Sequence, residues 1–168
     1  MQTGLQPDLP ALFDRAHKLG LTTSLDTNWD PSNEWLGFDE LLSHVDVFLP
    51  NQNEALGIAH MNDPAIALAY LASKARLVAM KRGTDGASLQ TGHTIISVPS
   101  IPVELIDTVG AGDSFNAGFL YGYLNNWELE KSLRFASVCG AISTQSAGGT
   151  NGQPTLEEAM EYLTRYFS

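Results

Sequence analysis

The stretch DTVGAGDSFNAGF, residues 107–119, decides the fold and the chemistry of this chain. Its glycine-rich first half passes into an apolar run long enough for a helix that ends near Asn125. Amides at the start of a helix have no intrahelical partner, and the helix dipole adds about half a positive charge there. Bare backbone at Gly110 and Gly112 lets an anion approach these amides, and Asp113 adds a carboxylate at the edge of the anion site. Such an arrangement can hold a phosphoryl group and accept a proton from a hydroxyl.

The same residues also have a purely structural interpretation. Aspartate is common in the first turn of a helix because it caps free amides, and glycine is common where a loop meets a helix. For a Gly-x-Gly-Asp string alone, this interpretation is the simpler one. A choice between the two interpretations therefore needs the rest of the chain.

Helix and strand patterns alternate along the first half of the chain, which predicts a mostly parallel sheet covered by helices. Such sheets bind ligands beyond the carboxyl ends of their strands, where polar clusters follow Leu25, Leu49 and Met80. Helices are predicted at 7–19, 35–45, 51–58, 64–75, 111–125, 129–146 and 156–167, and strands at 21–25, 46–49 and 77–80, with a hairpin of strands at 87–91 and 94–98.

Composition limits the classes of function. A chain of 168 residues with 43% hydrophobic and 17% charged residues predicts one folded domain, 1–168. The net charge of −10 argues against nucleic acid or an anionic membrane as a partner, and no run is long enough for a membrane helix. The single Cys139 lies in an apolar run and cannot form an internal disulfide, which fits a reducing cytoplasm. The four histidines show no metal-ligand spacing.

The full string DTVGAGDSF, residues 107–115, resembles the signature of the ribokinase-like, phosphofructokinase-B type carbohydrate kinases. The resemblance implies that Asp113 is the catalytic base and that Gly110, Ala111 and Gly112 form an anion hole. It also implies a three-layer, Rossmann-like α/β fold in which helices cover both faces of a mostly parallel sheet. ATP is then the expected phosphoryl donor, and a sugar hydroxyl is the expected acceptor.

A second motif of the family is Asn-x-x-Glu, which matches Asn51 and Glu54. In the family this motif serves the metal and phosphate network, so the resemblance implies a role with Mg²⁺, which prefers oxygen ligands. The structural alternative is an ordinary helix start, in which Asn51 caps the helix and Glu54 interacts with its dipole.

The segment Lys81–Gly86 resembles the family's nucleotide loop, and 143–152 resembles the loop that closes around adenine. A plain turn into the hairpin is the structural alternative for the first segment. In many members the second loop also binds a monovalent cation such as K⁺, for which Asp107 and the Val109 carbonyl are the expected partners. The nucleotide-binding positions implied in this way are Lys81, Gly83, Gly86, Thr108, Ser143 and Gly148.

The segment Asp26-Thr27-Asn28-Trp29-Asp30 resembles an Asp-x-Asn-x-Arg stretch of some sugar and sugar-acid kinases. Here Asp30 stands where the arginine would be, which removes a charge suited to an acidic substrate.

The resemblance covers only the later part of the family pattern, without the early sugar site and the lid. We therefore expect the nucleotide-binding and catalytic-base half of a sugar kinase, with little activity by itself and with a tendency to form homo-oligomers through an exposed sheet edge. Two alternatives stay open: a non-catalytic nucleotide-binding or regulatory module, and a vitamin kinase of the same fold with a pyridoxal- or pyrimidine-like substrate.

Overall fold

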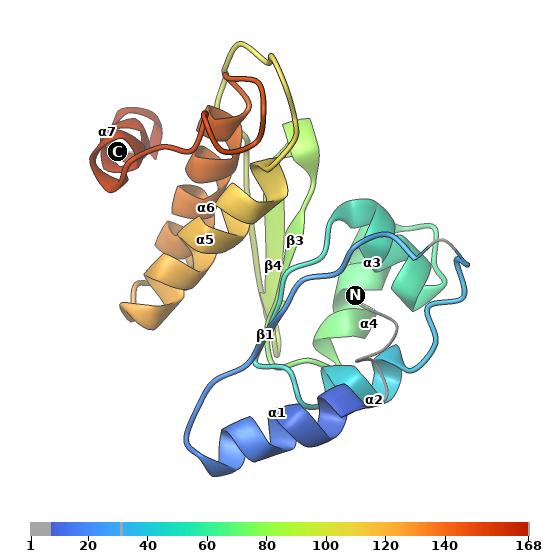
Figure 1. Ribbon diagram of the computed structural model, residues 1–168. Coiled ribbons are helices and arrows are strands. Elements are labelled where there is room, and N and C mark those ends of the chain that lie inside the picture. Colours follow the sequence, from blue (N-terminus) through green and yellow to red (C-terminus); the bar gives the residue numbers. More distant parts are fainter. Residues whose placement is uncertain (1–7, 31, 168) are drawn as a thin grey trace. The chain divides into compact units, whose positions relative to one another are not determined.

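The computed structural model describes residues 8–30 and 32–167 (Figure 1). Its elements follow the predicted alternation closely, although Pro7, the predicted start of the first helix, lies outside the described residues. The elements are α1 (Leu9–Lys18), β1 (Ser24–Leu25), α2 (Phe38–Leu42), β2 (Val47–Phe48), α3 (Gln52–Ala59), α4 (Pro64–Ala72), β3 (Val78–Lys81), the 3-10 turn η2 (Gly83–Asp85), β4 (Ala87–Thr91), β5 (Thr94–Val98), α5 (Ala111–Leu124), α6 (Leu129–Ser143) and α7 (Leu156–Phe167).

The strands form one five-stranded sheet in the order β1-β2-β3-β4-β5. β1 pairs in parallel with β2, and β2 pairs in parallel with β3, with Leu25 opposite Phe48 and Phe48 opposite Val78. β4 and β5 are joined by a tight turn at Gly92, as the sequence predicts for a hairpin. Because β1 and β2 are parallel and in register, the segments that follow them leave from the same edge of the sheet.

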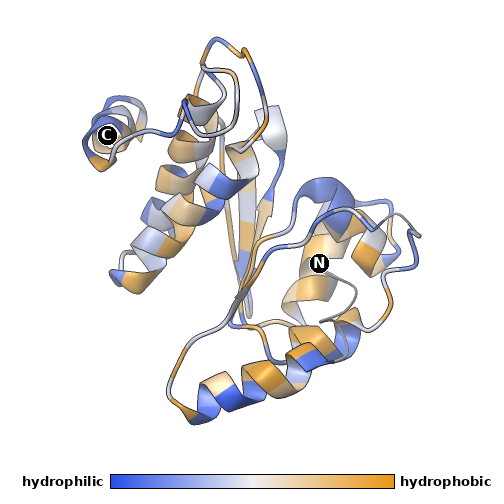
Figure 2. Ribbon diagram, in the orientation of Figure 1, coloured by the Kyte–Doolittle hydropathy of each residue, from blue (hydrophilic) through white to orange (hydrophobic). Residues whose placement is uncertain are grey.

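The described residues form two compact units, and the first comprises residues up to 80 together with 89–95. Its core is built from apolar side chains of α2, α3, α4 and the first three strands, among which Leu42, Phe48, Leu71 and Val78 are fully buried. α1 is different, since hydrophilic and hydrophobic positions alternate along it (Figure 2) and none of its residues is buried.

The second unit comprises residues 81–88 and those from 96 onward, and it contains α5, α6 and α7. α5 and α6 run side by side (Figure 1) and approach closely at two glycines of α5. A Cβ at Gly118 would lie 2.9 Å from the Cys139 sulfur, and a Cβ at Gly122 would lie 2.5 Å from the Ser132 hydroxyl. Larger residues at either position would therefore force the two helices apart.

One difference from the predicted elements has a local cause. The helix expected over 35–45 is reduced to α2, because Trp35 and Gly37 have positive φ values of 50° and 78°, which a helix does not accommodate. Within α4, Ile66 is 57% exposed, whereas Leu68 is buried. None of the helices in the described ranges has the length and hydrophobicity needed to cross a lipid bilayer.

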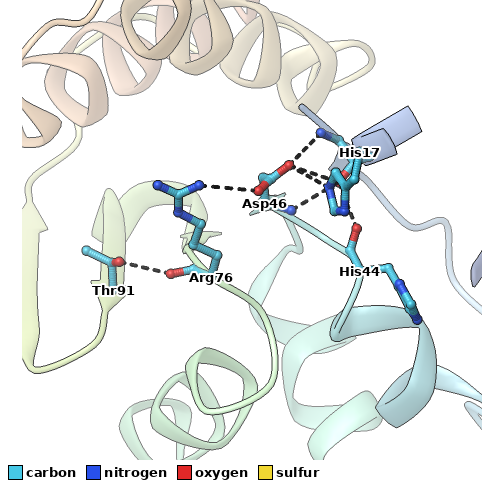
Figure 3. Close-up of polar contacts among 6 residues, drawn as sticks. His17, His44, Asp46, Arg76 and Thr91 are labelled. Atoms are coloured by element: carbon cyan, nitrogen blue, oxygen red, sulfur yellow. Dashed lines mark hydrogen bonds and ion pairs between the residues drawn. The ribbon is translucent and has the colours of Figure 1, made fainter. Parts of the chain in front are cut away.

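A partly buried carboxylate joins the elements of the first unit at the amino ends of the parallel strands (Figure 3). Asp46, just before β2, has a side chain that is only 13% exposed. Its Oδ2 accepts a hydrogen bond from the Thr23 amide at 2.9 Å and lies 2.9 Å from His17 Nε2, while its Oδ1 lies 3.5 Å from an Arg76 nitrogen. Thr91 of β4 donates to the Arg76 carbonyl at 2.9 Å. The network thus connects α1, the segments that directly precede β1, β2 and β3, and strand β4.

We expect Asp46→Asn to lower the free energy of unfolding by about 1–3 kcal/mol near neutral pH, because a partly buried, charge-assisted network loses its negative charge and one acceptor oxygen. Burial raises the pKa of the Asp46 carboxyl, but the hydrogen bonds from Thr23 and His17 lower this pKa by more than burial raises it. The pKa of Asp46 therefore lies below its ordinary value. The stabilisation is therefore present above the unfolded pKa of about 3.9 and is lost as the pH falls through the lower folded pKa.

Urea denaturation of both proteins between neutral pH and about pH 3 measures this difference. The gap between the two proteins should shrink below about pH 4. Glu161→Gln, which removes an exposed carboxylate from α7, is the control and should change little. A gap that is absent at neutral pH, or that widens on acidification, contradicts the assignment.

Candidate active site at the start of α5

The first turn of α5 begins at Gly110, whose φ of 79° lies in the left-handed region. A Cβ at this position would lie 2.5 Å from the Gly149 carbonyl oxygen, so both the conformation and the close approach require glycine. The Ala111 amide donates to the Thr108 carbonyl at 3.2 Å, a long bond that a bound anion would have to replace. Asp113 lies in the first turn with its side chain exposed.

Lys81, the last residue of β3, brings a positive charge to this helix start. Its Nζ donates to Asn116 Oδ1 at 3.1 Å, and a Cβ built on Gly112 would lie 3.7 Å from the same Nζ. The ammonium group therefore lies beside the amides that are predicted to bind phosphate. The sequence did not identify Asn116; the signal that could have found it is its position one helical turn after Asp113.

The predicted nucleotide loop is a tight turn between β3 and β4. Gly86 has a φ of 84°, and a Cβ there would lie 2.1 Å from the Val98 carbonyl oxygen, so glycine is required. Gly83 also has a positive φ, but a Cβ there would meet open space. The Arg82 side chain donates to the Ser88 hydroxyl at 3.3 Å, which fixes the base of the turn.

Asp107 ties the central motif to the loop that follows α6. Its Oδ1 accepts from the Val109 amide and its Oδ2 accepts from the Gly148 amide, each at 3.0 Å. These bonds, that from Gly148 first, hold the pKa of Asp107 below its ordinary value. The Thr144 carbonyl accepts from the amides of Ile106 and Asp107 at 2.8 and 3.0 Å. Two segments that the sequence assigned to nucleotide and cation binding are therefore joined.

Ser143 is placed differently from what a nucleotide contact requires. It is fully buried at the end of α6, and its hydroxyl donates to the Gly140 carbonyl at 2.8 Å. Its role in this structure is to satisfy a carbonyl of its own helix.

Asn51 and Glu54 form the start of α3 in the first unit. Asn51 Oδ1 accepts from the Glu54 amide and Glu54 Oε2 accepts from the Asn51 amide, each at 2.9 Å, which is a complete capping box. The Thr27 hydroxyl donates to the same Glu54 oxygen at 3.1 Å, and Glu54 is only 4% exposed. These contacts agree with the structural alternative for the motif, and its metal role stays a prediction. Within the described ranges, no group of three or more His, Cys, Asp or Glu residues could hold a metal ion.

An open pocket of about 240 Å³ lies next to Asp113 within the second unit. Its walls include Tyr121, Phe135, Cys139 and Leu156 and are mostly apolar. Burial raises the pKa of the Cys139 thiol to about 12, so this cysteine is a core residue and not a nucleophile at neutral pH.

Comparison with known proteins identifies the class to which this fold and site belong. Residues 2–156 match the family described as pfkB family carbohydrate kinase, and the chain belongs to this family.

Among the relatives, an ATP-dependent ribose-1-phosphate kinase of Halopiger xanaduensis is 31% identical over 98% of this chain and 54% of its own length. A solved ribokinase of Arabidopsis thaliana, complexed with ribose and ATP, has a TM-score of 0.83 at 25% identity, and the match covers 97% of this chain and 53% of that chain. A putative ribokinase II of E. coli, in complex with ATP and Mg²⁺, has a TM-score of 0.80 at 26% identity. The match covers 92% of this chain and 52% of that chain.

These similarities confirm the predicted fold class, an α/β fold of the ribokinase-like type with a mostly parallel sheet. The chain spans about half the length of the relatives that it matches.

Gly112→Ala separates a structural from a ligand-binding role for the helix start. Gly112 has no positive φ, and a Cβ there meets only Lys81 at 3.7 Å, so the fold accommodates alanine. Because alanine favours a helix, the free energy of unfolding should stay the same or rise by up to about 1 kcal/mol. The added methyl group crowds the amides, so we expect ATP affinity, measured by calorimetry, to fall about tenfold or more.

Gly86→Ala is the matched contrast in the same unit. Its Cβ would lie 2.1 Å from a backbone oxygen at a φ of 84°, so it should destabilise the protein by about 1–3 kcal/mol. Unchanged ATP affinity in a stable Gly112→Ala protein shows that these amides do not face a phosphate.

Proposed function

We propose that this chain forms the nucleotide-binding and catalytic-base part of a carbohydrate kinase, which transfers the γ-phosphoryl group of ATP to a hydroxyl of a sugar or sugar derivative. One observation carries the proposal: the start of α5 places the Asp113 carboxylate, a glycine-bounded row of amides and the Lys81 ammonium in one small region. Membership of the family and the ATP and ribose complexes of similar proteins support the same function.

In the proposed reaction, the Asp113 carboxylate takes the proton of the acceptor hydroxyl as its oxygen attacks the γ-phosphorus. The bond between this phosphorus and the bridging oxygen of ADP breaks, and ADP leaves with the electron pair. The amides at Gly110, Ala111 and Gly112, with the charge of Lys81, stabilise the negative charge on the transferred group.

The remaining parts of the nucleotide site follow from the same proposal. Mg²⁺ would neutralise charge on the phosphates, and Asn51 and Glu54 are the residues proposed to hold it through bound water. The turn with Gly83 and Gly86 and the segment with Thr108 and Gly148 would enclose the nucleotide. Ser143 would contribute to this segment through its backbone, since its hydroxyl is bonded inside α6. Asp107 and the Val109 carbonyl are proposed as partners of a K⁺ ion.

The acidic balance of the chain and its single buried cysteine support a cytoplasmic enzyme that does not bind nucleic acid. Phosphoryl transfer needs a positioned acceptor and exclusion of water. We therefore expect the 168-residue chain to bind ATP but to phosphorylate sugars only weakly. ATP binding with no product from any sugar would favour a nucleotide-binding module, and turnover of a pyridoxal- or pyrimidine-like compound would favour a vitamin kinase.

The role of Asp113 is tested by making Asp113→Asn in a version of this protein for which sugar phosphorylation has first been measured. Because the amide cannot take up the hydroxyl proton, kcat should fall by about 10²–10⁴ while ATP affinity stays within a few fold. Glu161→Gln, an exposed change on α7 in the same unit, is the control and should retain activity. Near-normal turnover by Asp113→Asn contradicts the assignment of the base.

We further propose that the chain self-associates through the outer edge of β1. The Thr23 and Leu25 carbonyls accept from Val47 and Leu49 on the β2 side, so the backbone groups of Ser24 point away from β2. Among the residues that the structure describes, β1 is the end strand of the sheet order, and the nearby Leu21 is 59% exposed. An open edge beside exposed apolar surface favours pairing with a second copy.

Light scattering of Leu21→Lys tests this self-association. A charge beside the edge should lower the associated fraction, whereas Leu124→Lys, which changes an equally exposed leucine of α5, should leave it unchanged. A monomeric parent protein, or equal association of both variants, rules out this edge as the interface.

A further inference from the structure

Trp29 presents an aromatic surface at the carboxyl end of β1. Its side chain is 54% exposed, and its indole meets Trp35 edge-on, with ring centroids 5.4 Å apart at 84°. Trp35 is only 4% exposed and contacts Phe38 at a centroid distance of 5.8 Å. The exposed ring is thus supported by the buried Trp35, which in turn packs against the buried Phe38 of the first unit.

The loop that carries Trp29 is held by several bonds. The Asp30 carboxylate accepts from the amides of Ser32 and Trp35 at 2.9 and 3.0 Å. Trp35 Nε1 donates to Asn33 Oδ1 at 3.1 Å, and the indole fits so closely over α3 that a Cβ at Gly57 would lie 2.5 Å from it. A ring on such a base loses little conformational freedom when a ligand binds.

Polar groups suited to hydroxyls come from the same segment. Asp26 and Asn28 are exposed on either side of Thr27, whose buried hydroxyl connects the loop to Glu54. A carboxylate accepts hydrogen bonds from hydroxyls, and an amide both donates and accepts. An aromatic face with such groups nearby matches a sugar ring, which has an apolar C–H face and a rim of hydroxyls.

The charge around this surface excludes one class of sugar. No lysine or arginine occurs between Lys18 and Lys74, whereas this stretch holds acidic residues both in the loop and around it. The hydrogen bonds from Trp35 and Ser32 keep the pKa of Asp30 below its ordinary value, so this carboxylate is charged at neutral pH. Sugar acids and sugar phosphates would therefore meet the like charge of Asp30 here.

We propose that Trp29, with Asp26 and Asn28, is a binding platform for a neutral sugar. The inference that this sugar is the phosphoryl acceptor rests on the proposed kinase function, while binding of the sugar to the platform does not. In that case Trp29 and Asp30 together determine which class of sugar accepts the phosphoryl group.

The experiment is a titration of the 168-residue chain, followed by the NMR signals of its three indole N–H groups. The probes are D-ribose, D-gluconate and ribose 5-phosphate at equal ionic strength, each to about 100 mM, which would saturate a site with a Kd of ~10 mM. We expect saturable shifts of the Trp29 signal with ribose and none with the two anions. Trp29→Ala should weaken ribose binding about tenfold or more, Trp29→Phe should retain most of it, and Trp127→Phe in the second unit should change nothing.

Circular dichroism confirms that each variant is folded, and ATP calorimetry on the same samples tests the nucleotide site separately. No ribose-dependent shift at Trp29 in a protein that binds ATP overturns the platform and leaves the proposed function standing. Tighter binding of either anion than of ribose, or equal ribose affinity in Trp29→Ala, also overturns it. Ribose binding at Trp29 without ATP binding supports the platform and counts against the kinase function.

Discussion

The first turn of α5 is fixed by a contact between two glycines, in which the left-handed Gly110 lies against the Gly149 carbonyl so closely that no side chain fits. The contact brings the loop after α6 against the central motif, and the Asp107 carboxylate secures it through the amides of Val109 and Gly148. The direction of α5, the exposure of its first amides and the position of Asp113 all follow from this constraint. The close packing of α5 on α6 at Gly118 then keeps the helix in place.

Much of the fold could be predicted from the sequence, because helix and strand patterns alternate along the chain and several strands end near glycine or proline. α7 and the hairpin occur at the predicted residues. α2 was predicted too long because Trp35 is apolar and fits the helical period, although its backbone is left-handed and its ring packs against Gly57 of α3 instead. A tertiary contact overrides local preference there, and no local pattern reports it.

The candidate site could be predicted where one continuous string carries it, as for Asp107, Gly110 and Asp113. It could not be predicted where it depends on contacts between distant segments. The bond between Lys81 and Asn116 joins residues from a strand end and from the second turn of a helix, and only the fold shows that they meet. Ser143 illustrates the opposite error, since a residue type suited to a ligand is used inside its helix. Glu54 is likewise buried in a capping box.

A net charge of −10 does not by itself exclude a ligand as negative as ATP, because groups within a few ångströms of a phosphate contribute most to its binding. The long acidic stretch without lysine or arginine belongs to the first unit, which includes Trp29. Lys81 and the bare amides of α5 belong to the second unit, where Arg82 also lies. Coulomb attraction is strongest over a few ångströms and is screened by salt over about 10 Å. A single ammonium beside a helix start can therefore attract phosphate inside an acidic protein.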